Sequence, residues 1–244
     1  MTVRSAGNRS SVPIDWPRIE SFVGYGRADA PVVFIGPEEH LDSVEGLSDE
    51  LRLRSTYDRY MDRRNALASS PSEDLLGKFV RTWKPMNDLM LRRGSGAKPT
   101  YEKRREYQIE ALGTQTGDAL LTELLPYPSP DRYGWVYGTI SRFLHRTEYE
   151  DALTSSRVEM LKKILASHRR ELVVCYSKHD WCTFERLFPG ARWGDVGSHL
   201  RVATYGSTRV LLTTHFSRGF QSESSLDTLA TVALGEWPAR PTEA

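Results

Sequence analysis

The sequence predicts an α/β protein, a three-layer α/β/α sandwich around a mostly parallel central sheet. Three observations indicate this class: apolar runs too short for helices, amphipathic helical segments between them, and glycine or proline at the boundaries. The short runs lack polar alternation, which is typical of parallel strands covered by helices on both faces. We expect one domain over residues 13–237, flanked by short polar tails at 1–12 and 238–244.

The first two elements are a helix and a strand. Apolar residues recur at helical spacing over residues 15–24 and stop at Gly24-Tyr25-Gly26, which predicts a short helix ended by glycine. The β-branched run 31–35 is too short for a helix and lies between Pro31 and Gly36. This run is the first predicted strand.

A helical insert is expected at about residues 45–112. Residues 70–73 form a capping box with proline at the first helical position, and an apolar stripe continues to Trp83. Pro85 should kink or end that helix. Residues 101–112 form a further predicted helix, and we expect the insert to cover a pocket or bind a partner.

The remaining segments alternate between strand and helix. A capping box at Ser156–Glu159 predicts the start of a helix. A glycine-led pair, Gly206-Ser207, predicts a hairpin turn. The predicted elements are a strand at 119–125, a helix from 156 through 165, a strand at 171–176, a hairpin over 200–214 and a helix at 222–234 stopped by Gly235.

Bulk properties exclude several classes of protein. Lys and Arg number 33 against 32 Asp and Glu, so the chain as a whole has no strong preference for polyanions. Its two cysteines are too few for a disulfide framework, a four-cysteine zinc site or an iron–sulfur cluster. No apolar run approaches the roughly 20 residues that span a bilayer. We expect a soluble cytoplasmic protein without membrane contact or cofactor.

Polar side chains follow two of the predicted strands. The run 32–35 ends at Gly36-Pro37-Glu38-Glu39-His40, and the run 210–214 ends at His215-Phe216-Ser217-Arg218. The carboxyl ends of parallel strands meet at one edge of a sheet, so these segments are expected to share a site. Acidic residues and a histidine brought together in this way favour an enzyme.

These segments, together with Leu120-Leu121-Thr122-Glu123-Leu124-Leu125-Pro126, resemble motifs of the uracil-DNA glycosylase superfamily. The similarity covers roughly residues 20 to 235 in element order. It implies the superfamily fold, DNA as partner, and hydrolysis of the N-glycosidic bond of a base to leave an abasic site. A lysine at a matched position is missing, so a monofunctional enzyme is expected.

The resemblance also implies roles for individual residues. Glu38, or else Glu39, would orient the attacking water, and an anion there would stabilise the oxocarbenium-like sugar. His215 would stabilise the departing base as negative charge builds on it. The substrate-binding positions implied by the loops and strand ends are Gly36, Pro37, His40, Glu123, Tyr127, Ser177, Phe216, Ser217 and Arg218.

Glu123 is the main departure from the family pattern, which has an asparagine at this position. An ionised carboxylate only accepts hydrogen bonds, so it fits the exocyclic amine of cytosine or adenine better than uracil. A cytosine-derived or otherwise modified base is therefore expected, for example a hypermodified base of invading phage DNA. The alternative is that Glu123 is protonated in an apolar pocket.

Aromatic side chains supply candidates for stacking against an extruded base. Tyr127 is the best placed, because it follows Glu123 closely at the same strand end. The other candidates are Tyr57, Tyr133 and Trp135.

Two other functions remain open from the sequence. One is a catalytically silent protein on the same fold that binds nucleic acid or a nucleotide, which the near-zero net charge and the missing asparagine favour. The other is a metal-assisted hydrolase that uses Glu38, Glu39, His40 and His215, since carboxylate and imidazole suit divalent ions.

Overall fold

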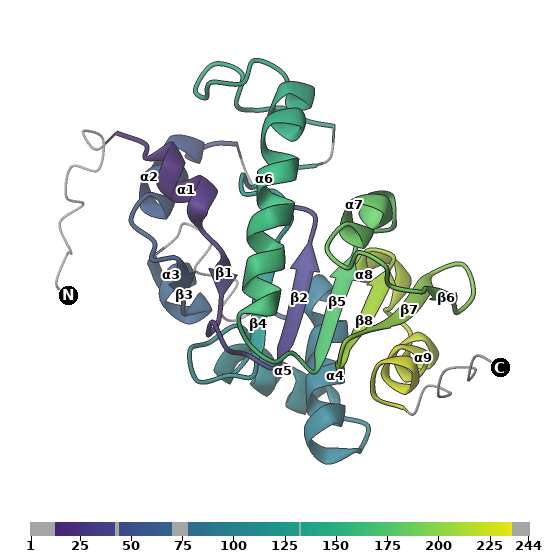
Figure 1. The fold of residues 1–244 in the computed structure, drawn as a ribbon. Helices are drawn as coiled ribbons and strands as arrows, with labels where there is room; N and C mark the ends of the chain where they lie inside the picture. Colours follow the sequence, from purple (N-terminus) through teal and green to yellow (C-terminus); the bar gives the residue numbers. More distant parts are fainter. Residues whose placement is uncertain (1–12, 42–43, 70–77, 132, 236–244) are drawn as a thin grey trace, which may run out of the picture.

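The computed structural model describes residues 13–41, 44–69, 78–131 and 133–235. Within these ranges the chain forms one eight-stranded sheet with helices on both faces (Figure 1). The sheet order is β3-β1-β4-β2-β5-β8-β7-β6. The strands are β1 (Gly24–Tyr25), β2 (Val32–Gly36), β3 (Tyr60–Met61), β4 (Ala119–Glu123), β5 (Leu172–Tyr176), β6 (Gly194–Asp195), β7 (Leu200–Tyr205) and β8 (Thr208–Thr213).

Four central strands, β4, β2, β5 and β8, are parallel. The chain passes from β2 to its neighbour β4 on one side and then returns to β5 on the other. Connections that leave in opposite directions make the carboxyl ends of β2 and β5 the switch point of the sheet, where α/β proteins bind ligands. At the flanks β1 is antiparallel to β4, and β7 is antiparallel to β8. The mostly parallel sheet is confirmed.

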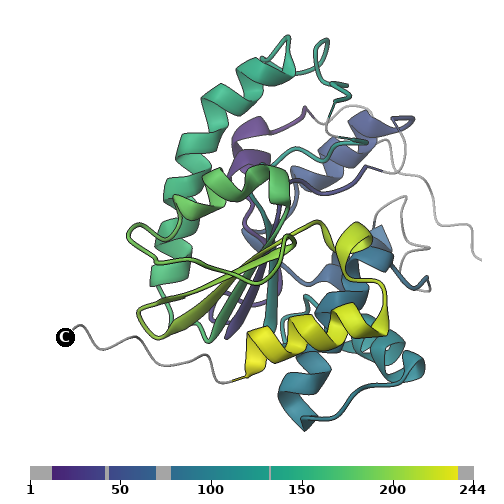
Figure 2. The same ribbon diagram turned by 90° about the vertical axis from the view of Figure 1, so that its right-hand side faces the viewer.

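Helices cover the sheet in two layers. Figure 2 shows the long green α6 and the shorter α7 on one side, with yellow α9 and blue α4 and α5 on the other. The sheet lies between them, as the sequence predicts. The helices are α1 (Trp16–Ser21), α2 (Leu47–Arg54), α3 (Arg63–Ser69), α4 (Lys84–Ser95), α5 (Tyr101–Glu110), α6 (Arg146–Ala166), α7 (Trp181–Glu185), α8 (Phe216–Gly219) and α9 (Glu223–Leu234), with 3₁₀ turns η3 (Arg81–Trp83) and η4 (Lys178–Asp180).

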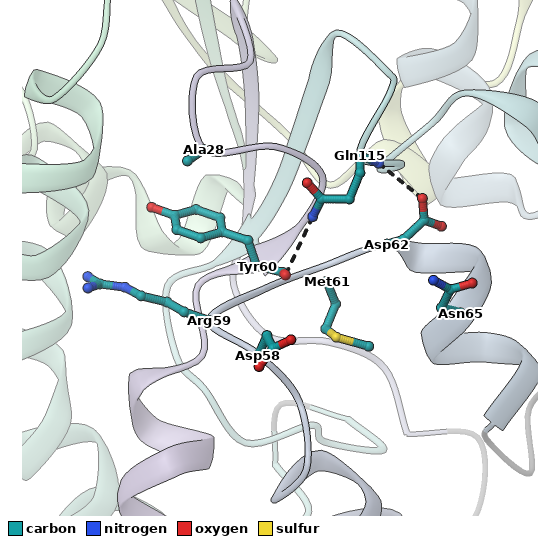
Figure 3. Close-up of a pocket in the computed structure, with 8 residues that line it drawn as sticks. All are labelled: Ala28, Asp58, Arg59, Tyr60, Met61, Asp62, Asn65 and Gln115. Carbon is teal, nitrogen blue, oxygen red and sulfur yellow. Dashed lines mark hydrogen bonds between the residues drawn. The ribbon is translucent and has the colours of Figure 1, made fainter.

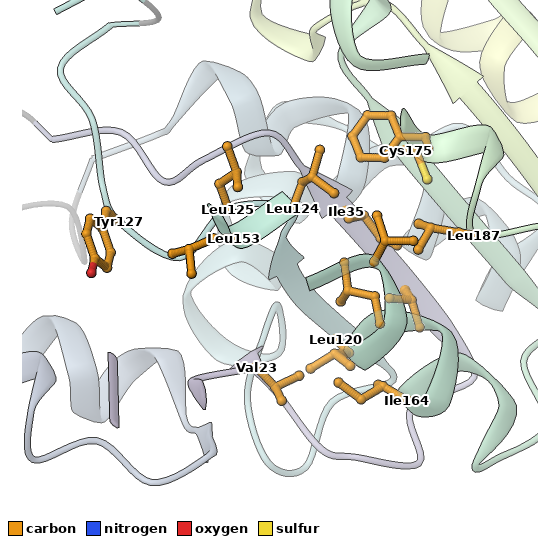
Figure 4. Packing of buried hydrophobic residues seen from close by; sticks show 14 of the residues in the cluster. Val23, Ile35, Leu120, Leu124, Leu125, Tyr127, Leu153, Ile164, Cys175 and Leu187 are labelled. Carbon is orange, nitrogen blue, oxygen red and sulfur yellow. The ribbon is translucent and has the colours of Figure 1, made fainter. Parts of the chain in front are cut away.

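Alternate residues of each central strand enter separate cores. Val33 and Ile35 pack in the first core with α1, α2, α6 and α7, part of which is drawn in Figure 4. Val32 and Phe34 pack in the second core with α4, α8 and α9. Both sides of β2 are therefore apolar, and a strand of this kind shows no alternation in the sequence.

Residues 45–112 contribute to the sheet and its layers. Tyr60 and Met61 extend the sheet as β3, and Met86, Leu89 and Met90 of α4 fill the second core. The predicted capping box at 70–73 lies outside the described residues. This region therefore supplies part of the sandwich itself.

Three helix boundaries predicted from the sequence are wrong. Helix α1 ends at Ser21, before the predicted glycine stop, and Gly24 and Tyr25 form strand β1. Pro85 does not end a helix; it lies in the first turn of α4, where proline has no intrahelical hydrogen bond to lose. Ser156 does not begin a helix, because it lies inside α6, which starts ten residues earlier at Arg146. Glu148 Oε2 accepts hydrogen bonds from the backbone of Leu144 and His145, which satisfies donors at that helix start.

Several local predictions are confirmed. The hairpin of β7 and β8 turns at Gly206, whose φ of 61° is favoured by glycine. Helix α9 begins after Ser222, whose side chain accepts from Ser225 N, and its C-cap is Gly235. The strand predicted at 119–125 is present but ends at Glu123.

Candidate functional site

Four residues form a row across the carboxyl ends of the parallel strands. Gly36 of β2 pairs with Glu123 of β4, and Tyr176 of β5 pairs with Thr213 of β8. Because Ile35 pairs with Cys175, the next positions along β2 and β5 are Gly36 and Tyr176. Strand alternation places this row on the side of the second core. We call Glu38, Glu123, Tyr176 and His215 the carboxyl-edge cluster.

Gly36 lets two side chains meet above the sheet. A Cβ atom at this position would lie 2.0 Å from Glu123 Oε2 and 2.4 Å from the Tyr176 hydroxyl oxygen. Neither separation is possible for real atoms, so the two side chains occupy the space that any larger residue would need. Glycine is required here by close approach.

Glu123 has one bound oxygen and one unbound oxygen. Oε1 accepts a hydrogen bond of 3.2 Å from the Tyr176 hydroxyl. Oε2 is buried and has no partner among the described residues, although the residue as a whole is partly exposed. Burial, followed by the charge of Glu39, raises the pKa of Glu123 well above its usual value. These surroundings favour the uncharged acid.

Arg157 of α6 fixes the backbone that carries Glu123. Its guanidinium donates to the carbonyl oxygens of Glu123, at 2.7 Å, and of Leu124, at 3.2 Å. It also donates to the carbonyls of Glu20 and Phe22. Burial lowers the pKa of Arg157 to about 10. Arg157 is thus a positioning residue that ties the end of β4 to α1 and α6.

Glu38 is held by a single ion pair. Its Oε2 lies 2.7 Å from Arg146 Nη2, while Oε1 is buried without a partner among the described residues. Burial raises the pKa of Glu38 to about 7, and this effect outweighs the attraction of Arg146. A carboxyl with this pKa changes charge near neutral pH, which suits a general acid or base.

Glu39 is engaged differently from Glu38. Arg54 donates to its Oε2 at 2.8 Å, and the Tyr25 hydroxyl lies within 3.2 Å of both carboxylate oxygens. These partners belong to α2 and β1, on the far side of β4 from β5. Of the two predicted water activators, Glu38 is therefore the one with an oxygen left for a ligand.

His215 follows β8 and belongs to the same cluster. Its Nδ1 is 2.8 Å from Ser217 Oγ, and its ring contacts Tyr176 edge-on with centroids 5.7 Å apart. Burial lowers the pKa of His215, and the positive charges of Arg218 and His40 lower it further. The lowered pKa favours the neutral imidazole at pH 7, and in the tautomer whose Nδ1 accepts from the Ser217 hydroxyl the ring proton is on Nε2.

The other residues of the two predicted loops fall into distinct positions. The Pro37 carbonyl accepts from Leu125 N, and His40 pairs with Ser129, so the loop after β2 runs beside the loop after β4. The Ser177 hydroxyl donates a hydrogen bond to Asp180 Oδ2. Arg218 is exposed at the edge of the sheet.

Two predicted substrate-binding aromatics are core residues. Tyr127 is 1% exposed and stacks on Tyr149 in an aromatic group of the first core. Phe216 is fully buried and stacks on Tyr176, with centroids 4.8 Å apart and planes at 7°. Phe216 thus supports the cluster from beneath, and Tyr127 packs apart from it with Trp16 and Tyr137.

Sequence reasoning missed Tyr176 and Arg146. Tyr176 ends an apolar run, so its position predicts only a core residue, and the signal for its role is the glycine paired beside it. Arg146 lies before the helix start that the sequence predicts at Ser156, and His145 is not a usual N-cap. Glu148, three residues after His145, is the one signal that could have placed this helix start.

The molecule also has a surface pocket away from the cluster. It has a volume of about 520 Å³ and lies along β3, between Asp58, Asp62, Asn65 and Gln115 (Figure 3). None of the predicted site residues lines it. Gln115 spans this pocket, since its side chain donates to Tyr60 O and its backbone donates to Asp62.

The described residues contain no group of three or more histidine, cysteine, aspartate or glutamate side chains arranged to hold a metal ion. Glu38, Glu39, His40 and His215 therefore do not converge as the metal-assisted alternative requires. Across the same parts of the chain, every helix is too short or too polar to traverse a lipid bilayer. Comparison with protein-family models and with curated proteins finds no match for this chain.

Proposed function

We propose that this protein is a monofunctional DNA glycosylase that hydrolyses the N-glycosidic bond of a modified base and leaves an abasic site. The observation that carries the proposal is the state of Glu38. One oxygen is anchored on Arg146, the other has no partner among the described residues, and the pKa is about 7. A carboxylate held in this way can take a proton from water at neutral pH.

In the proposed reaction Glu38 Oε1 accepts a proton from a water molecule. The water oxygen bonds to the sugar carbon C1′ as the bond from C1′ to the base nitrogen breaks. The electron pair of that bond leaves with the base, which becomes an anion. Before the proton is transferred, the negative charge of Glu38 stabilises the positive charge that develops on the sugar.

His215 stabilises the leaving base by donating a hydrogen bond to it. Its imidazole is neutral because burial and nearby positive charges lower its pKa. A neutral ring does not form an ion pair with the Glu38 carboxylate, so Nε2–H donates to the leaving base. A preorganised donor directed at developing negative charge contributes about 3–4 kcal/mol to barrier lowering in well-studied enzymes. The stacked pair of Tyr176 and Phe216 holds the ring beside it.

The test is a panel of oligonucleotides, single- and double-stranded, that contain uracil, hypoxanthine, 5-hydroxymethylcytosine or its glucosylated forms. Alkali-labile sites are expected from at least one base with the wild-type protein. Glu38→Gln should lower the single-turnover rate about 10²–10⁴-fold, because it removes the carboxylate that acts as general base on the water. Glu39→Gln, which alters a carboxylate with both oxygens engaged, should have a much smaller effect.

Folded protein that forms no abasic site from any base would overturn the glycosylase and favour a silent nucleic-acid-binding protein. Equal rate losses for Glu38→Gln and Glu39→Gln would show that Glu38 is not the water activator. The rate of the wild-type enzyme is expected to rise with pH through about 7 as Glu38 ionises. The same rise in Glu38→Gln would assign the titration to another group.

A further inference from the structure

We propose that Glu123 and Tyr176 form an uncharged hydrogen-bonded pair over Gly36, in which Glu123 Oε2–H donates to a carbonyl oxygen of the base. This pair selects bases with a carbonyl at that edge over bases with an amino group. The identity of the ligand as a base rests on the proposed function. The pair itself rests on the geometry of β4, β2 and β5.

The position of the proton follows from the hydrogen bonds. The Tyr176 hydroxyl lies 3.2 Å from Glu123 Oε1, and this is its one hydrogen bond to a described residue. A phenol always carries its proton at neutral pH, so Oε1 is used as the acceptor. The acid proton of Glu123 is then on Oε2, the oxygen with no partner among the described residues.

The two nearby acidic groups raise the pKa of Glu123, as burial does. Glu39 and Glu38 lie close enough to raise its pKa, and both belong to the loop after β2. The positive charge of Arg157 from α6 opposes them, but its guanidinium donates to four backbone carbonyls. Tyr176 from β5 also opposes them by donating to Oε1. Desolvation is the largest of these influences.

The geometry makes Oε2 specific for an acceptor. Gly36 and Tyr176 close two sides of the Glu123 carboxyl, as the distances from a Cβ atom at Gly36 show. Glu123 is the last residue of β4 and is partly exposed, and its buried Oε2 lies beside Gly36, so a base that binds Oε2 has to approach at this strand end. An O–H at that point donates a hydrogen bond to a carbonyl oxygen. It cannot form one with an amino group, because both groups are donors. This inverts the expectation for an ionised Glu123.

The protonation state can be measured without any reaction. In infrared difference spectra at pH 7, wild type minus Glu123→Gln should show the carbonyl stretch of a protonated carboxylic acid. The same band should shift in Tyr176→Phe, because the hydrogen bond to Oε1 is lost. Bands of an ionised carboxylate in place of the acid band would overturn the proposal.

Ligand selection is tested by calorimetry with free bases in two matched pairs. Uracil and cytosine differ in a carbonyl against an amino group at one ring position, as do hypoxanthine and adenine. Each carbonyl member is expected to bind at least about tenfold more tightly, since the other leaves a buried donor unpaired. Glu123→Gln, which keeps a donor, should retain the preference, and Glu123→Leu should lose it. Tighter binding of the amino members, or no binding of any base, would overturn the proposal.

Tyr176→Phe separates a positioning role from simple packing. The ring still stacks on Phe216, so the variant should fold, but Glu123 loses the partner that directs its proton to Oε2. We expect the carbonyl preference to fall about fivefold, as one neutral hydrogen bond allows. An unchanged preference would assign Tyr176 to packing alone.

The two proposals fail separately. Protein with the acid band and the carbonyl preference but without abasic product keeps the neutral pair and loses the glycosylase. Protein that forms abasic sites but shows an ionised Glu123 keeps the glycosylase and loses the neutral pair.

Discussion

Two groups of buried carboxyl side chains among the described residues have different surroundings. Asp88 of α4 is 1% exposed, and each of its oxygens is bound by an arginine. Arg92 approaches Oδ2 at 2.7 Å and Arg104 approaches Oδ1 at 2.6 Å. Arg104 also binds Glu223, so the group connects α4, α5 and α9. In the carboxyl-edge cluster, Glu38 and Glu123 each have one buried oxygen without a partner among the described residues.

The difference separates a structural carboxylate from candidate functional ones. Burying a charge is unfavourable unless it is paired and hydrogen-bonded, and Asp88 meets this condition completely. Glu38 and Glu123 meet it in part, and burial raises the pKa of both. Buried groups with perturbed pKa values at the ligand-binding edge of an α/β sheet are candidates for chemistry.

The largest expected effect comes from removing the buried ion pairs of Asp88. Asp88→Ala leaves Arg104, which is 4% exposed, without its buried partner on α4. The free energy of unfolding should fall by about 3–5 kcal/mol in urea denaturation. Glu106→Ala on α5, the helix that carries Arg104, removes an exposed pair with Lys103 and should change the free energy of unfolding by at most about 1 kcal/mol. Similar losses in both variants would show that Asp88 is not a structural centre.

The second expected effect is a gain in stability, and it concerns Glu38 of the carboxyl-edge cluster. The pKa of Glu38 rises from 4.5 to about 7 on folding, so its contribution to stability is fully present below pH 4.5 and is lost as pH rises through 7. Gln does not ionise and avoids this loss. Glu38→Gln should therefore be more stable than wild type by up to about 3 kcal/mol at pH 8.

The difference should shrink below pH 5, and denaturation curves at pH 4, 6 and 8 measure it. Arg146 keeps its ion pair with Glu150 in this variant. Asp88→Asn is the matched comparison, because it should destabilise the protein at pH 8. A Glu38→Gln variant less stable than wild type at pH 8 would show that the Arg146 pair outweighs burial.

The smallest expected effect tests whether Glu123 and Tyr176 require a glycine at position 36. Gly36→Ala places a methyl group where Glu123 Oε2 and the Tyr176 hydroxyl already lie, and should lower the free energy of unfolding by about 1–3 kcal/mol. Gly94→Ala in α4 meets nothing within 4 Å and should stabilise the helix by about 0.5–1 kcal/mol. Thermal unfolding of both variants tests this contrast. No loss at Gly36 would mean that the two side chains separate freely.

The sequence predicts the central strands well and the flanks poorly. Runs such as 31–35 and 171–176 are apolar and β-branched, and both are strands of the sheet. The strands β1, β3 and β6 have two residues each, so they carry no periodic pattern. The start of α6 is missed because Ser156 offers a stronger local signal than His145, and local capping energy is small compared with the packing of a whole helix.

The candidate site is predictable in its outline. Glu38 and His215 are visible at strand ends, and the parallel sheet brings those ends to one edge. The sequence does not distinguish Glu38 from Glu39, because neighbouring residues with the same side chain differ only in their partners. It also does not reveal Tyr176 as the partner of Glu123, since their contact joins residues 53 positions apart.

The sequence by itself determined the layered α/β class and the types of side chain that reach the carboxyl edge. These depend on hydrophobic periodicity and on turn residues, which are local properties. Only the tertiary structure decided which carboxyl groups are paired, which oxygens stay without a partner among the described residues, and in which direction each pKa moves. Desolvation and hydrogen bonding depend on atoms brought together from β2, β4, β5 and α6, and no segment of the chain contains that information alone.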